Sequence, residues 1–206
     1  MSPEISLKNL KERFSFLQKL ISDERFLKMQ GLGNELPFYI CPYKPNEAVE
    51  MEGHLAPLIR ELSQADVHAL HINLYDLCLS LLKERGIFDQ LIELEPQTTK
   101  AEFLEPLQGV LDPAQHLVPA IAKRMKEKQF SVLLLSGVGE IYPYIRSNLI
   151  LNNLQSVVTG HPTVLFFPGE YTYGADSGSS LDLFNRLHDD KYYRAFNIFY
   201  CDLPTS

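Results

Sequence analysis

The amino-acid sequence predicts a single α/β domain, residues 1–206, built on a mostly parallel sheet of about five strands flanked by helices. Two mainly apolar runs, 130–135 and 163–167, are typical of strands buried on both faces of a parallel sheet. A helix is predicted between them over residues 143–158, so this stretch describes a βαβ unit. We therefore expect a Rossmann-like arrangement, or a degenerate P-loop-like one without a Walker A motif.

The first part of the chain alternates helical periodicity with short apolar runs. In order, it contains a helix from Leu10 to Gly31, a strand over 36–41, a helix over 47–64, a strand over 69–74 and a helix that ends at Gly86. Pro37 limits the first of these strands to a strand start or an edge position, because proline cannot donate to the ladder.

Residues 87–111 are less regular, and we predict short helical pieces that break at Pro96, Pro106 and Gly109. Asp112 then opens a clearer helix as its N-cap, with a proline at the first helical position. The sequence leaves open whether residues 87–128 form a helical insert within the domain.

The C-terminal part completes the alternation. The helix between the two buried strands is expected to turn Ile145, Leu149 and Leu154 toward the sheet. A last helix is predicted around 181–187, and a final strand over 195–200.

Composition excludes several classes of protein. Hydrophobic residues make up 45% and charged residues 22%, which is ordinary globular usage. No apolar run approaches the roughly 20 residues that cross a bilayer, and the N-terminus does not resemble a secretory signal. The 3 cysteines lie far apart, which does not indicate a disulfide framework. We therefore expect a cytoplasmic protein with no membrane association.

The charge pattern argues against direct binding of DNA. The net charge is −7, and the densest basic cluster, 123–128, is interrupted by Glu127. Sequence-independent DNA binding needs several basic residues aimed at phosphates. It would require scattered basic residues to gather on one face, and the candidates are Lys44, Arg60, Arg146 and Arg186.

Carboxylates and glycines follow the carboxyl ends of several predicted strands, where parallel sheets bind their ligands. This candidate ligand rim consists of Asp76, Gly137, Gly139, Glu140, Gly169 and Glu170. If Asp76, Glu140 and Glu170 converged, they could hold Mg²⁺ as oxygen ligands. Alternatively, each carboxylate lies at a helix N-terminus, where negative charge is favourable. We favour this second interpretation because isolated motifs are weakly specific.

No complete catalytic or metal-binding motif is present. The Gly-x-Gly at 137–139 lacks the third glycine of a dinucleotide fingerprint, and no Walker A lysine occurs, so a tight strand-to-helix turn is the better interpretation. His68 and His71 are three apart at a strand start and are expected on opposite faces. There is no C-x-x-C, H-E-x-x-H or G-x-S-x-G. The sequence therefore predicts no catalytic residue, no metal and no cofactor.

The segment 171–194 is rich in tyrosine and charge. We expect a flexible polar loop of about ten residues within it, long enough to be functional. The candidate protein interface is Tyr171, Tyr173, Asp189, Asp190, Tyr192, Tyr193 and Arg194. Tyrosine and arginine are typical anchors of protein interfaces, but tyrosines packed on a sheet edge would give the same pattern. Both interpretations stay open.

Several strings of the chain resemble the BrxB family of BREX (bacteriophage exclusion) systems. They are Gly31–Glu35, Ile72–Leu77, Leu107–Pro113, Gly137–Glu140, Tyr144–Ser147, Phe167–Tyr171 and His188–Ile198. The resemblance runs from the first helix almost to the C-terminus. It implies a role in defence against phage, beside a PglZ-type phosphatase-like protein, an ATPase and an adenine-specific methyltransferase. No catalytic residue is carried over with it.

Two hypotheses of function follow. The first is a non-enzymatic adaptor that binds other BREX components, PglZ above all, in the methylation of host DNA and the restriction of phage. The second is a nucleotide- or Mg²⁺-binding sensor or enzyme that uses Asp76, Glu140 and Glu170 with Gly137 and Gly139. A thermal shift with nucleotide or divalent metal would favour the second.

Overall fold

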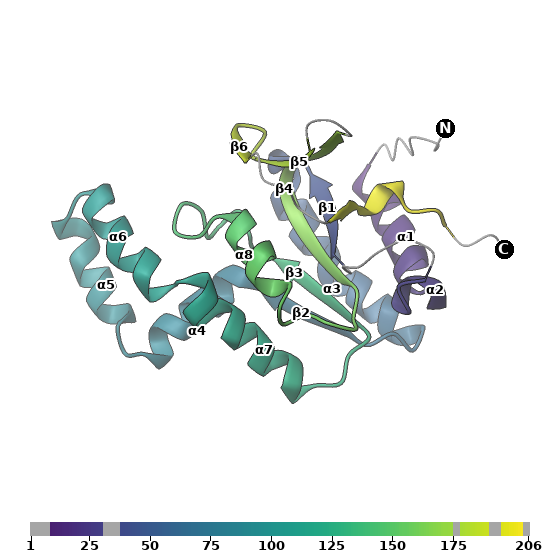
Figure 1. Ribbon diagram of the computed structural model, residues 1–206, viewed down its shortest axis with the longest axis horizontal. Helices are drawn as coiled ribbons and strands as arrows, with labels where there is room; N and C mark the ends of the chain where they lie inside the picture. Colours follow the sequence, from purple (N-terminus) through teal and green to yellow (C-terminus); the bar gives the residue numbers. More distant parts are fainter. Residues whose placement is uncertain (1–8, 31–37, 175–177, 190–194, 204–206) are drawn as a thin grey trace.

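The computed structural model describes residues 9–30, 38–174, 178–189 and 195–203 (Figure 1). Five parallel strands form the main sheet in the order β2-β3-β4-β1-β7. Their bounds are β1 (Phe38–Tyr43), β2 (Ala69–Asn73), β3 (Val132–Ser136), β4 (Thr163–Gly174) and β7 (Phe196–Asn197). Beyond its parallel part, β4 pairs antiparallel with β5 (Gly178–Leu183), and β5 pairs with β6 (Leu187–Asp189). The predicted fold class is confirmed.

Helices cover both faces of this sheet (Figure 1). One face is covered by α1 (Leu10–Ile21), α2 (Glu24–Leu27) and α3 (Ala48–Gln64), the last preceded by the short 3₁₀ helix η1 (Pro45–Glu47). The other is covered by α4 (Leu74–Glu84), α7 (Val118–Glu127) and α8 (Ser147–Leu154). Helices cover both faces because the strands of the sheet carry apolar side chains on both sides.

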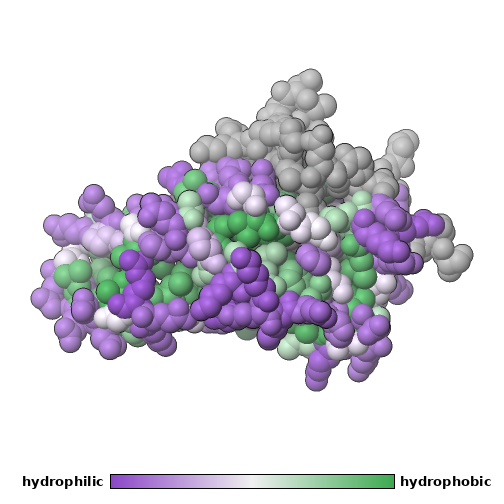
Figure 2. Space-filling view, turned by 60° about the horizontal axis from the view of Figure 1, so that its bottom comes forward, coloured by the Kyte–Doolittle hydropathy of each residue, from purple (hydrophilic) through white to green (hydrophobic). Residues whose placement is uncertain are grey.

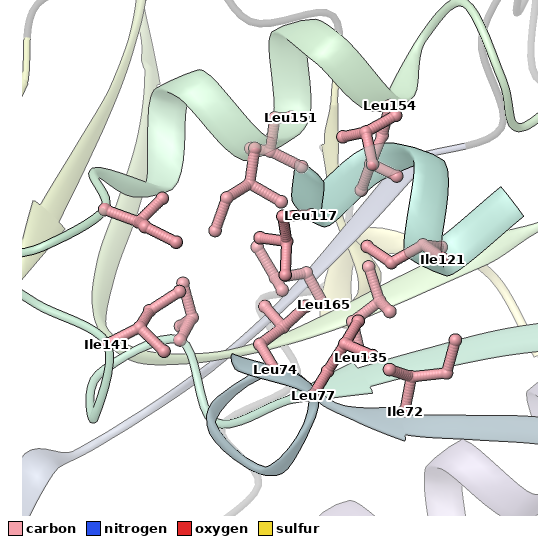
Figure 3. Packing of buried hydrophobic residues seen from close by; sticks show 14 of the residues in the cluster. Ile72, Leu74, Leu77, Leu117, Ile121, Leu135, Ile141, Leu151, Leu154 and Leu165 are labelled. Atoms are coloured by element: carbon pink, nitrogen blue, oxygen red, sulfur yellow. The ribbon is translucent and has the colours of Figure 1, made fainter. Parts of the chain in front are cut away.

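Side chains along β3 alternate between two hydrophobic cores, one on each face of the sheet. Leu133 and Leu135 belong to the core under α4, α7 and α8, whereas Val132 and Leu134 belong to the core under α1 and α3. Figure 3 shows Leu135 and its neighbours meeting leucines of α8 and Ile121 of α7. Each fully buried leucine of this kind stabilises the fold by about 1.5–3 kcal/mol.

The helical insert forms an arm that projects from the body at the left of Figure 1. It contains α5 (Phe88–Leu94), the 3₁₀ helix η2 (Glu95–Gln97) and α6 (Lys100–Val110). Contrary to prediction, Pro106 and Gly109 lie inside α6 and do not break it. A capping box between Thr99 and Glu102 and the buried Leu107 hold the helix on either side of Pro106.

The chain re-enters the body through a π-helix, η3 (Pro113–Leu117), that leads directly into α7. The predicted N-cap is confirmed, because the Asp112 side chain accepts a hydrogen bond from the Gln115 amide at 2.8 Å. In α8 the expected inward residue Leu149 is exposed, while Ile150 and Leu151 are buried. α8 begins only at Ser147, whereas the predicted helix began at residue 143. The buried face therefore differs from the one expected for the longer helix.

The prediction of a helix over 181–187 is wrong. Leu181 and Leu183 are buried and Asp182 between them is not, which is the period of a strand, and these residues form β5. The predicted loop is also mostly strand, since β4 continues to Gly174 and β5 begins at Gly178. Residues 175–177 between them lie outside the described part.

The final strand is shorter than predicted. β7 covers two residues, after which the Asn197 side chain accepts a hydrogen bond from the Phe199 amide and starts the 3₁₀ helix η4 (Ile198–Tyr200). β1 extends through Pro42 to Tyr43, which is further than predicted. The expectations for Gly31 and Pro37 lie outside the described residues.

Candidate functional site

The carboxyl ends of β1, β2 and β3 form a polar rim. Asn73 ends β2, and its side-chain oxygen accepts hydrogen bonds from the Tyr75 and Asp76 amides at 2.9 and 3.2 Å. It is therefore the N-cap of α4. The same side chain also lies near the carboxylate of Glu52, in the first half of α3, and opposes the rise in the pKa of that group. One asparagine thus lies beside groups of helices on opposite faces of the sheet.

Three carboxylates gather around this asparagine. The pKa of Glu52 is raised by partial burial and, after that, by the negative charges of Glu140 and Asp76. Burial also raises the pKa of Tyr43, and the charges of Glu140 and Glu52 add to the effect. The charges of Asp76 and Glu140, two carboxylates of the candidate ligand rim, thus both act on Glu52. Glu52 and Tyr43 carry no sequence motif and were not among the predicted rim residues.

Glu170 does not take part in this group. It lies on the β4–β5 hairpin, where its backbone is opposite Asp182. Among the described residues, no three His, Cys, Asp or Glu side chains are arranged to hold a metal ion. Asp76 lies in the first turn of α4, where its charge is favourable, in agreement with the helix-terminus interpretation.

The three rim glycines are positions of close approach. A Cβ atom at Gly137, where φ is +77°, would lie 2.3 Å from the Asn73 side-chain oxygen. At Gly139 it would lie 2.8 Å from the ring of Pro168, and at Gly169 it would lie 2.1 Å from the Asp182 carbonyl oxygen. The space beside each glycine is thus filled by the protein's own groups, as in a tightly packed turn.

A histidine and a serine meet below the rim. His71 on β2 and Ser136 on β3 are joined by a hydrogen bond of 2.9 Å between Nε2 and Oγ. Burial lowers the pKa of His71, and the nearby Asp76 opposes that shift, so the ring is neutral near pH 7. Ser136 is fully buried within the sheet, so its hydroxyl is closed to a substrate in this structure. We interpret this pair as a cross-strand contact.

The predicted interface segment is only partly described. Tyr171 is buried, and its hydroxyl donates a hydrogen bond to the Ala195 carbonyl at 2.6 Å. Its expected role as an exposed anchor is therefore corrected, because the ring belongs to the core of the hairpin. For Tyr173 and Asp189 the structure describes the backbone alone, within β4 and β6. Asp190, Tyr192, Tyr193 and Arg194 lie outside the described residues.

Exposed apolar side chains follow that segment in the chain. They are Phe196, Tyr200 and Leu203, and Tyr200 is 63% exposed. We call these three residues the C-terminal apolar surface. These residues carry no sequence motif, so the tyrosine-rich pattern of 171–194 does not point to them.

A second apolar region lies along the arm. A groove of about 420 Å³ runs between α4, α5, α6 and the chain that follows β3, and its lining includes Tyr75, Leu91, Ile92, Phe103 and Tyr144. Figure 2 shows hydrophobic residues on the arm between hydrophilic ones. Ile92 is 55% exposed there. We call this feature the arm groove.

The fold and these surfaces define an α/β protein whose strand-end rim is closed by its own side chains and whose apolar residues are exposed at two distant places. A family model described as "BREX protein BrxB" matches residues 70–198. A BREX protein BrxB of Bacillus cereus (strain H3081.97) is 32% identical over 93% of this chain and 98% of the relative. One from Escherichia coli O9:H4 (strain HS) is 30% identical over 92% and 91%.

The chain therefore belongs to the BrxB family, and the suspected resemblance is confirmed. Membership in this family supports its assignment as a component of a BREX phage-defence system. No solved structure matches the fold. In the part of the chain that the structure describes, no helix has the length and apolar character needed to cross a membrane.

Proposed function

We propose that this protein is a non-enzymatic adaptor that binds other proteins of its BREX system, with a PglZ-type phosphatase-like protein as the main partner. The ATPase and the methyltransferase of the system are further candidate partners. The observation that carries the proposal is membership in the BrxB family along most of the chain.

Two surfaces support a binding role. The C-terminal apolar surface places Phe196 and Tyr200 in solvent beside a hairpin, and aromatic side chains are enriched in the cores of interfaces. The arm groove offers a concave apolar region on a different side of the molecule, with Ile92 at its exposed part. An adaptor needs at least two such surfaces if it is to join two partners at once.

The first experiment is co-purification of the tagged chain from cells that carry the complete BREX operon. We expect the PglZ-type protein in the eluate, in a ratio that survives gel filtration. Recovery of the chain without any other BREX protein would contradict the adaptor.

Surface variants then assign the partner to a surface. Phe196→Ser with Tyr200→Ser is expected to weaken one complex, and Ile92→Ser another. The matched control is Val49→Ser on α3, because Val49 is also apolar and is 90% exposed, yet it lies at neither surface. Tyr192→Ala with Arg194→Ala tests the remaining part of the predicted interface. If all of these variants bind like the control, the interface lies elsewhere.

A further inference from the structure

A separate pocket lies between the start of α8 and the turn of the β5–β6 hairpin. It has a volume of about 290 Å³. Its lining among the described residues comes from two segments far apart in sequence and includes Tyr142, Arg146, Ser147, Leu181, Leu183, Arg186 and Leu187. Of these residues, Tyr142 also lines the arm groove, and none belongs to the acidic rim.

Two arginines face this pocket without a counter-charge among the side chains that the structure describes. No ion pair or hydrogen bond joins the guanidinium of Arg146 or Arg186 to any residue the structure describes. In the hairpin, Asp182 alternates with Leu181 and Leu183 and so points to the other side of the strand, whereas the backbone of Asp189 is paired with that of Leu181. The two basic residues that looked scattered in the sequence therefore meet at one place.

The N-terminus of α8 adds positive potential to the same pocket. Arg146 occupies the N-cap position and makes no side-chain capping bond, and the first turn has no acidic residue. Helices α1, α4 and α6 are instead capped by Asn9, Asn73 and Thr99. A cation at a helix N-terminus is unfavourable, because the dipole and the free amides there attract anions.

Ser147 adds a hydroxyl group to the same pocket. The residue lines the pocket and is only 6% exposed, and its hydroxyl makes no hydrogen bond to a described residue. The hydroxyl oxygen is not among the buried polar atoms left without a partner, so it reaches the open space of the pocket, where it can bond to a ligand. A ligand oxygen in the pocket would accept that bond.

We propose that this pocket binds a phosphate monoester attached to a small apolar or aromatic group, such as a nucleoside monophosphate. Two guanidinium groups, helix amides and a hydroxyl supply more donors than the two oxygens of a carboxylate can use, whereas a phosphate monoester has three terminal oxygens and nearly two charges. Tyr142 and the three leucines form walls for the rest of the ligand.

Isothermal titration of the full chain tests the proposal, with inorganic phosphate and adenosine monophosphate as separate ligands at constant ionic strength. Both bind, and the nucleotide binds more tightly because its base contacts the apolar walls. Arg146→Gln and Arg186→Gln each weaken binding at least tenfold, and Ser147→Ala weakens it less. Arg60→Gln on α3 is the matched control and binds like the unchanged protein.

Four results would overturn the proposal. The first is the absence of heat for either ligand up to about 5 mM, which is weaker than a useful site. The second is equal binding by the arginine variants, once their thermal unfolding shows that they are folded. The third is binding of N-acetyl-leucine as tight as that of the nucleotide, which would make the pocket a carboxylate site. The fourth is binding of inorganic phosphate without tighter binding of adenosine monophosphate. That result would restrict the ligand to the ion and contradict the proposed role of the apolar pocket walls.

Discussion

The acidic rim and the arginine pocket hold opposite charges, and they differ in how those charges are satisfied. At the rim, Asn73 caps α4 and lies near Glu52, whose charged form it favours, so the carboxylates are part of the folded framework. In the pocket, Arg146 and Arg186 have no such role among the described residues. Folding explains the rim, whereas the pocket has charges that stability alone does not explain. A charged side chain without a partner inside the protein is therefore a better indication of a binding site than a cluster of charges is.

The largest effect is expected at the rim from Gly137→Ala. The new methyl group would lie 2.3 Å from the Asn73 oxygen at a φ of +77°, so we expect a loss of about 3 kcal/mol in the free energy of unfolding. Urea unfolding followed by circular dichroism measures it. Gly109→Ala is the control, because a Cβ there meets nothing within 4 Å and the change should stabilise α6 by about 0.5–1 kcal/mol. Equal stability of the two variants would show that the rim is not tightly packed.

A smaller effect of opposite sign is expected in the pocket. Arg146→Asn gives α8 a proper N-cap and removes the unfavourable cation, so the free protein should gain about 1 kcal/mol of stability. The same variant should lose the stabilisation that adenosine monophosphate gives to the unchanged protein. Thermal unfolding with and without the nucleotide measures both. A variant that is less stable in both conditions would mean that Arg146 supports the fold.

His71 should make the rim sensitive to acid. Burial lowers its pKa in the folded state below the value of about 6.5 in the unfolded chain, so stability is lost as the pH falls below that value. His71→Gln should remove about 0.5 kcal/mol of this loss between pH 7 and pH 5, a figure reduced for partial exposure. His68→Gln serves as the control, since that side chain is 62% exposed. An unchanged pH slope in the His71 variant would contradict this interpretation.

The smallest effect concerns Glu52. Its raised pKa means that stability is full below the unfolded pKa of about 4.3 and falls as the pH rises through the folded pKa. Glu52→Gln removes this loss and keeps an acceptor for Asn73, so we expect a gain of a few tenths of a kcal/mol at pH 7. Glu50→Gln in the first turn of α3 should give no gain. Denaturation at pH 4 and pH 7 compares the two variants.

Much of the fold could be predicted because buried parallel strands leave continuous apolar runs. Residues 130–135 and 163–167 pointed correctly to β3 and β4, which pair in parallel. The hairpin could not be predicted, because Leu181, Leu183 and Leu187 fit helical spacing nearly as well as strand alternation over so short a stretch. The error in secondary structure also hid Arg186, which only a turn between two strands brings beside Arg146.

The rim also contains some residues that the sequence could indicate and others that it could not. Asp76 and Glu140 were found because they follow strands, and the carboxyl ends of parallel strands share one edge. Glu52 lies inside a helix and carries no such signal, so its approach to Asn73 depends on how α3 crosses the sheet. Whether Asp189 and Tyr173 belong to an interface stays a prediction.

The arm is less buried than the central sheet. No residue of α5 is buried, and Leu107 is the one buried residue of α6. The other apolar contacts of these two helices with the core come from partly buried side chains, so local opening should cost less free energy here than in the sheet. Their amide protons should exchange with solvent long before those of β3, whose residues are all buried. A partner that settles in the arm groove would slow that exchange without changing the rate in the sheet, so the arm can serve as an internal reporter of occupancy.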